Sequence, residues 1–187
     1  FRTKEKEFVG FLIDYLETNN IHVLLPMGDS LAEIIAKNQD EFRQVTRILV
    51  PKLDIFNIAR DKRKTLEFAV KNNVPIPKMY SLEEIKDDRD ITYPIIIKPR
   101  ISSGSIGMKV AYNNEQVIKY YEETNIKFKD PIIQEMIPNI GEHFQANLLF
   151  DFNSELKASC VKKKVRQYPV YGGPSTFFKT VDHRKIE

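Results

Sequence analysis

The sequence predicts an α/β unit followed by an α+β region. In the first 60 residues, apolar positions at helical spacing alternate with short apolar runs, an order typical of a parallel sheet covered by helices. From residue 94 onward, segments that resemble strands predominate. Hydrophobic residues make up 42% and charged residues 29% of the 187 residues, so the chain can bury the core of one or two small domains.

The first unit is predicted to contain two strands between helices. Apolar residues at three- and four-residue spacing over 8–16 predict an opening helix. The apolar run 21–25, which ends at Pro26, predicts a buried strand, and residues 47–50, which end at Pro51, predict another strand. Two strands are few for a complete α/β sheet, so we expect this unit to be partial.

Capping patterns and prolines predict where the next helices begin and end. Ser30 with Glu33 predicts a capping box for a second helix, and Ser81 with Glu84 predicts another. A third helix is predicted over 61–72. Prolines at 75 and 77 keep the preceding residues extended, so we expect a boundary between compact units near this stretch.

The rest of the chain predicts mainly strands. Segments 94–98 and 107–112 flank a loop of small residues and predict a hairpin. Asn114 is expected to cap a helix that runs through Tyr121. Further strands are predicted over 131–137, 143–151 and 156–167.

Composition excludes several classes of protein. A net charge of +3, from 29 Lys and Arg against 26 Asp and Glu, is too small to indicate a nucleic-acid binder by itself. The single cysteine, Cys160, excludes an internal disulfide and a cysteine-rich zinc site, and we expect a cytoplasmic protein. The start at Phe1 resembles no signal peptide and lacks Met, so we expect a longer natural chain.

Three stretches carry residues suited to phosphate or nucleotide chemistry. Lys98 ends an apolar strand, and the following loop has three serines and two glycines over 102–107, whose backbone N–H groups could approach a phosphate. The strand and turn over 134–142 could offer main-chain groups to an adenine and a carboxylate to a ribose. In the strand after Cys160, Lys162, Lys164 and Arg166 share one face. Each stretch alone also fits a solvated loop or edge strand.

The order of these stretches resembles the ATP-grasp superfamily. Asp61-Lys62, IIIKPRISSGSIG from residue 95, QEMIP followed by GE from residue 134, and VRQYPVYGGPST from residue 165 follow one another. The chain is most similar to the carboxylate–amine ligases that resemble the large chain of carbamoyl-phosphate synthase. The resemblance implies a partial pre-ATP-grasp α/β domain over 1–60 and an ATP-grasp domain over 61–187, truncated at its C-terminus.

The resemblance implies a set of contacts to the phosphates of ATP. Lys62 would lie near the phosphates, and Lys98 would contact the α-phosphate and the adenine side of the site. The residues implied to form a lid over the β- and γ-phosphates are Ser103, Gly104, Ser105 and Gly107.

It also implies contacts to the nucleoside and to the substrates. Glu135 and Ile137 would bind adenine through main-chain groups, and Glu142 would bind the ribose hydroxyls. Lys164 and Arg166 would be catalytic, near the transferred phosphate and the acceptor substrate. The residues implied for a substrate-side loop are Gly172, Gly173 and Ser175.

The implied function is an ATP-dependent ligase. It would activate a small carboxylate as an acyl phosphate for attack by an amine. The family's magnesium ligands are expected beyond residue 187 and none within the chain, so we expect this chain to be an inactive fragment. We expect neither a membrane nor a nucleic-acid partner, and a homodimer is compatible with the sequence.

Two other functions fit the same residues. One is a non-catalytic module that binds a nucleotide or regulates another protein, and the other is an RNA-binding module that uses the basic strand.

Overall fold

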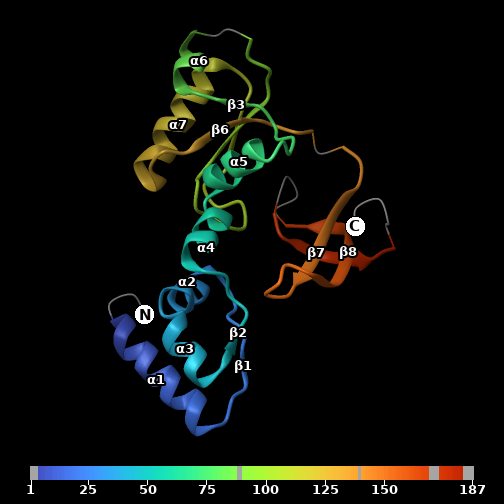
Figure 1. The fold of residues 1–187 in the computed structure, drawn as a ribbon. Coiled ribbons are helices and arrows are strands. Elements are labelled where there is room, and N and C mark those ends of the chain that lie inside the picture. The colour runs from blue at the N-terminus through green and yellow to red at the C-terminus, as the bar shows by residue number, and fades with distance from the viewer. Residues whose placement is uncertain (1–3, 88–89, 139, 169–172, 183–187) are drawn as a thin grey trace. The chain divides into compact units, whose positions relative to one another are not determined.

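The computed structural model describes residues 4–87, 90–138, 140–168 and 173–182 (Figure 1). Contacts between residues divide the chain into two compact units, Phe1–Ile76 and Pro77–Glu187. Within the described residues, no helix has the length and apolar character that crossing a membrane requires.

The first unit holds a two-stranded parallel sheet and five helices among its described residues. Val23 pairs with Arg47 and Leu24 with Ile48, which confirms a strand at each predicted position. The first strand is not buried as predicted, because Val23 is exposed and Leu24 is only partly buried. Phe42 and Ile35 are fully buried in the core of this unit. In chain order its elements are α1 (Glu5–Thr18), β1 (Val23–Leu24), α2 (Asp29–Lys37), α3 (Gln39–Val45), β2 (Arg47–Ile48), α4 (Leu53–Arg60) and α5 (Lys62–Lys71).

The predicted capping box at Ser30 is wrong. The N-cap of α2 is Gly28, two residues before Ser30, and the helix begins at Asp29. Gly28 has a φ of 89°, which suits a glycine, and no side chain caps the helix. The Glu33 carboxylate instead lies 2.6 Å from the Arg60 guanidinium at the end of α4. Burial would raise the pKa of Glu33, but Arg60 and Lys37 hold it below its ordinary value.

The sequence did not predict α3 or α4. Helix α3 has seven residues and buries only Phe42, which is too few apolar positions to establish a helical period. Helix α4 buries no residue fully. The predicted third helix is confirmed as α5, where the Asp61 carboxylate caps the N-terminus by accepting a 3.0 Å hydrogen bond from the Arg63 N–H.

The second unit contains a four-stranded antiparallel sheet with the order β3-β6-β4-β5. The pairing of β4 with β5 confirms the predicted hairpin. Helix α7 packs against β4, β5 and α6 and covers one face of the sheet (Figure 1). The elements are β3 (Met79–Tyr80), α6 (Leu82–Asp87), β4 (Ile95–Lys98), β5 (Lys109–Ala111), α7 (Asn114–Phe128) and β6 (Ile132–Glu135).

The two helices of this unit differ in how well the sequence predicted their caps. The capping box of α6 is confirmed, because Glu84 accepts from the Ser81 N–H at 2.7 Å and Ser81 Oγ accepts from the Glu84 N–H at 3.1 Å. The predicted cap at Asn114 is wrong by one residue. Asn113 caps α7, and the Asn114 side chain donates to the Ile85 carbonyl. The helix also continues to Phe128, seven residues past the predicted end.

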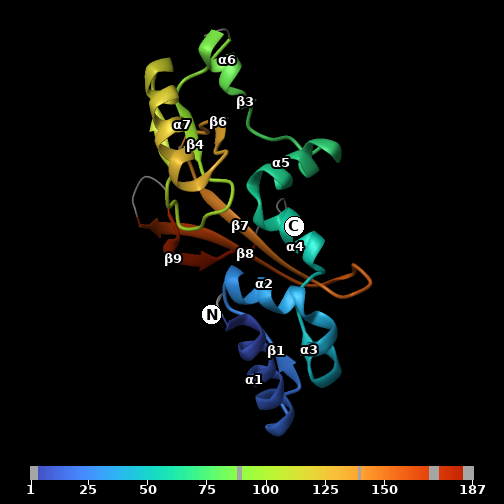
Figure 2. The same cartoon turned by 90° about the vertical axis from the view of Figure 1, so that its left-hand side faces the viewer.

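A second, three-stranded antiparallel sheet has the order β7-β8-β9 (Figure 2). It is formed by β7 (His143–Phe150), β8 (Leu156–Gln167) and β9 (Ser175–Thr180). The predicted strand over 156–167 is confirmed at both ends. Strand β9 was not predicted. Its register on β8 shifts between Lys164 and Arg166 and again before Gln167, which breaks the alternation that identifies a strand.

Candidate functional site

Strand alternation selects the side chains that can face a ligand in the four-stranded sheet. Ile95 and Ile97 are fully buried in the core, so Ile96 and Lys98 point to the opposite face. Ile96 pairs with Gln134 of β6, which places Gln134 on the face of Lys98. The Lys98 ammonium donates a 2.7 Å hydrogen bond to Gln134 Oε1.

The loop that follows Lys98 is held in an unusual backbone conformation. Gly104, Ser105 and Gly107 all have positive φ, at 60°, 62° and 76°. For Ser105 this conformation costs energy, and such strain is frequent at binding sites. A Cβ on Gly107 would lie 2.8 Å from Pro99 Cγ, so the loop returns to the sheet in close contact with the end of β4.

Lys98 and this loop border a cleft of about 360 Å³ within the second unit. The Glu135–Pro138 segment and residues of β7 and β8 complete its wall. The predicted site residues that line it are Lys98, Ser105, Glu135, Ile137, Lys164 and Gly173.

Lys164 reaches this cleft from the second sheet. Its ammonium donates to the Gly173 carbonyl at 3.0 Å and to Gln167 Oε1 at 3.1 Å. These bonds tie the end of β8 to the backbone just before β9. Lys164 is therefore fixed by its own strand and by the loop predicted to face the substrate.

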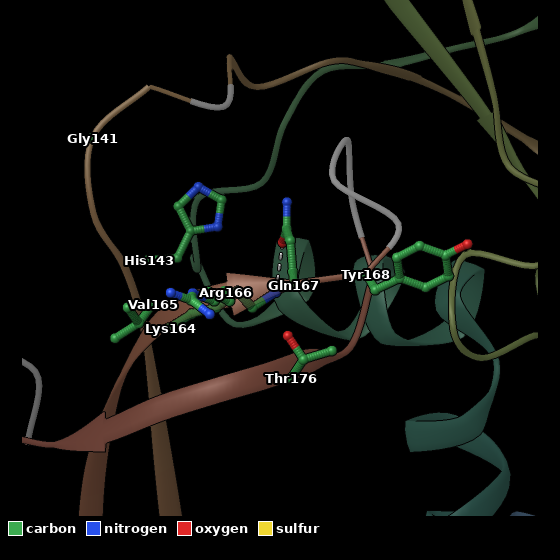
Figure 3. A pocket seen from close by; sticks show the side chains of 8 residues that line it. All are labelled: Gly141, His143, Lys164, Val165, Arg166, Gln167, Tyr168 and Thr176. Atoms are coloured by element: carbon green, nitrogen blue, oxygen red, sulfur yellow. Dashed lines mark hydrogen bonds between the residues drawn. The ribbon is translucent and has the colours of Figure 1, made fainter.

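A second cavity, of about 730 Å³, shares three of its lining residues with the cleft (Figure 3). The shared residues are His143, Lys164 and Gln167. Arg166 and Thr176 also line it, and no carboxylate is among its lining residues. The cavity therefore has a cationic wall suited to an anion.

Other predicted residues lie outside the cleft wall. Ser103, Gly104 and Gly107 belong to the same loop as Ser105 but do not line the cleft. Glu142 is exposed and forms an ion pair with Lys163.

The remaining predicted residues lie further along the chain or in the first unit. Ser175 pairs with Gln167 at the start of β9. Lys62 is half-buried in the first unit, where burial lowers its pKa against the opposing effect of Asp29 and Asp61. Gly172 lies outside the described residues.

Several residues that line the two cavities were not predicted from the sequence. The alternation of side chains along β4 could have identified Ile96, which lies on the face of Lys98. Gln134 lies on the same face only because β6 pairs with β4 in this register. His143 was not among the predicted site residues, yet it pairs with Lys164 across β7 and β8 and lines both cavities. That pairing depends on the strand register, which the sequence does not specify.

Curated relatives match parts of this chain. The large chain of carbamoyl phosphate synthase from Methanobrevibacter smithii is 31% identical over 113 residues, which are 57% of this chain and 11% of that protein. The arginine-specific large chain from Halalkalibacterium halodurans is 27% identical over 88% of this chain and 16% of its own length. D-alanine–D-alanine ligase from Borrelia duttonii is 49% identical over 43 residues, or 22% of this chain and 12% of that ligase. The chain thus spans between about a tenth and a sixth of the length of these relatives.

Solved structures share the fold, and a family model matches most of the chain. The biotin carboxylase domain of 2-oxoglutarate carboxylase from Hydrogenobacter thermophilus superposes with a TM-score of 0.66 at 18% identity, over 84% of this chain and 37% of that one. D-alanine–D-alanine ligase from Helicobacter pylori gives 0.56 at 15% identity, over 84% and 44%. The model that describes the ATP-grasp domain matches residues 59–187. The chain resembles the large chain of carbamoyl phosphate synthase and belongs to the ATP-grasp family.

Proposed function

We propose that the cleft beside Lys98 binds ATP as part of an ATP-dependent ligase that joins a carboxylate to an amine. The observation that carries this proposal is the convergence of Lys98, Ser105 and Lys164 on one cleft within the second unit. Ammonium groups beside a glycine-containing loop are suited to a polyphosphate. The names of the relatives support the ligase class, since carbamoyl phosphate synthase and D-alanine–D-alanine ligase are among them.

The adenine is proposed to lie against the segment that follows β6. The Glu135 and Met136 N–H groups already donate to the Lys78 and Pro94 carbonyls, at 2.8 and 3.1 Å. We therefore assign the adenine contacts to the Glu135 carbonyl and the Ile137 main chain. Ile137 is 59% exposed, and its side chain could cover the base.

The proposed reaction has two steps. A carboxylate oxygen attacks the γ-phosphorus of ATP, and ADP leaves. An amine then attacks the carbonyl carbon of the acyl phosphate, phosphate leaves, and the amine loses a proton. Positive charge close to the transferred group stabilises both steps, and we assign this role to Lys164 and Arg166. The cavity of Figure 3 is the proposed place for the acceptor carboxylate.

Magnesium is expected of the family, and the crystallised 2-oxoglutarate carboxylase domain holds the magnesium salt of ADP. Among the residues that the structure describes, no group of three or more His, Cys, Asp or Glu side chains is placed to hold a metal ion. The roles proposed above use only side chains and backbone of this chain.

Titration of ATP into wild type and Lys98→Ala tests the proposal. Loss of one charge-assisted contact is expected to weaken binding at least tenfold, because such contacts contribute about 1.5–3 kcal/mol. Lys119→Ala is the matched control, since Lys119 is an exposed lysine of α7 and lines neither cavity. Equal affinity of wild type and Lys98→Ala, or no binding of ATP to wild type, would contradict the proposal.

A further inference from the structure

A buried amide lies beneath the proposed phosphate-binding lysine. Gln134 is only 2% exposed, and both ends of its side chain are bonded. Its Oε1 accepts from the Lys98 ammonium at 2.7 Å, and its Nε2 donates to the Pro77 carbonyl at 3.1 Å. An amide flip would place a donor against an ammonium and an acceptor against a carbonyl, so the side chain has one favourable orientation.

We infer that Gln134 is a positioning residue that fixes the Lys98 ammonium in the cleft. Its role in nucleotide binding rests on the function proposed above. Because an amide is neutral, this bond orients the ammonium without cancelling its charge.

Two hydrogen bonds between Lys78 and Glu135 hold the backbone next to Gln134 in place. The Lys78 N–H donates to the Glu135 carboxylate at 3.1 Å, and the Glu135 N–H donates to the Lys78 carbonyl at 2.8 Å. These bonds flank the contact between Gln134 and Pro77. The Gln134 amide therefore connects Pro77, the first residue of the second unit, with Lys98 at the end of β4.

Competitive acetylation tests this inference without a nucleotide. The protein is treated with limiting acetic anhydride, and the labelling of Lys98 is measured relative to Lys119 by mass spectrometry. A hydrogen bond from an ammonium to an amide oxygen stabilises the unreactive protonated form. Gln134→Met removes that bond at nearly constant volume, so relative labelling of Lys98 is expected to rise about tenfold.

Two further variants separate positioning from general loosening of the sheet. Gln134→Glu keeps an acceptor for Lys98 but loses the donor to Pro77, and labelling is expected to stay at or below that of wild type. Gln44→Met, at an exposed glutamine of the first unit, is the control and should change nothing. If Gln134→Met does not fold, Gln134→Asn, which withdraws the amide by one methylene group, is expected to raise the labelling instead.

The outcomes separate this inference from the proposed function. A rise in Gln134→Met or Gln134→Asn but not in Gln134→Glu supports positioning, whether or not wild type binds ATP. Unchanged labelling in the folded variant, or an equal rise in Gln134→Glu, overturns it. If wild type binds ATP, Gln134→Met is also expected to weaken that binding several-fold, and unaltered affinity would restrict the role of Gln134 to the free protein.

Discussion

Ser81 and Glu84 form a reciprocal pair of hydrogen bonds at the start of α6. The bond from the Ser81 N–H is the main reason that the pKa of Glu84 lies below its ordinary value, and the Ser81 side-chain contact adds to it. A carboxyl whose pKa is lowered in the folded state stabilises that state above its unfolded pKa. The contribution is lost as the pH falls through the lowered folded value.

Glu84→Gln is therefore expected to reduce the free energy of unfolding at pH 7. The difference from wild type should shrink below about pH 4.5, the ordinary value for glutamate, and vanish once Glu84 is protonated in both states. Urea unfolding followed by circular dichroism between pH 3 and pH 7 measures it. Glu83→Gln, in the same turn, controls for the charge alone. A difference that does not depend on pH would contradict the assignment.

The same residue spacing gave a correct prediction at Ser81 and a wrong one at Ser30. Both serines are followed by a glutamate three residues later. At Ser30 the glutamate is used by Arg60 instead, and a glycine with positive φ begins the helix. Local sequence specifies a cap only where no tertiary partner competes for the carboxylate.

Of the two glycines in the loop between β4 and β5, Gly107 has much less space for a side chain than Gly104. A Cβ on Gly107 would lie 2.6 Å from the Phe128 ring and 2.8 Å from Pro99, whereas one on Gly104 meets nothing within 4 Å. Phe128 is partly exposed and can move, but Pro99 is fully buried and cannot. A side chain at position 107 would therefore prevent the close contact between the loop and the sheet. At position 104 a glycine is favoured only because the backbone there has a positive φ.

Gly107→Ala is expected to destabilise the protein by about 2 kcal/mol or more, because it adds overpacking to backbone strain. Gly104→Ala, with strain alone, should cost about 1 kcal/mol. Urea unfolding of both variants beside wild type makes the comparison. Equal losses in the two variants would show that the contact with Pro99 is unimportant.

Elements with a strong pattern of their own were predicted well, and those that depend on a neighbour were not. Strand β8 matches its predicted range at both ends, and the hairpin of β4 and β5 follows from two apolar runs around a loop of small residues. Strand β9 exists through its bulged pairing with β8, and β3 is two residues long. For the same reason the sequence identified Lys98 but not Gln134 or His143, whose positions follow from strand register.

At the scale of the whole molecule, the start of the family match and the division between the compact units fall at different residues. The family resemblance places the ATP-grasp domain from residue 61, and the family model matches from residue 59. Along the chain, the first compact unit ends at Ile76 and the second begins at Pro77. Residues 72–75, after α5, are exposed and contain a proline, as expected of a connecting segment.

Limited trypsin digestion is expected to cut first after Lys71, at the exposed end of α5. It should release one fragment of residues 1–71 and one of 72–187, both identifiable by mass spectrometry. Trypsin cleaves where a backbone can open locally, and a boundary between compact units opens most readily. First cleavage among Arg60, Lys62, Arg63 and Lys64 would instead place the boundary near residue 60.

We propose that one cleft of the second unit binds ATP with its phosphates at Lys98 and its base at the end of β6. A crystal structure of the protein with a non-hydrolysable ATP analogue tests it most directly. We predict phosphate oxygens within hydrogen-bond distance of Lys98 Nζ and of the 102–107 loop, with the adenine against Glu135 and Ile137. A nucleotide bound elsewhere, a base placed at Lys98 with phosphates at Ile137, or an empty cleft at saturating analogue would contradict the account.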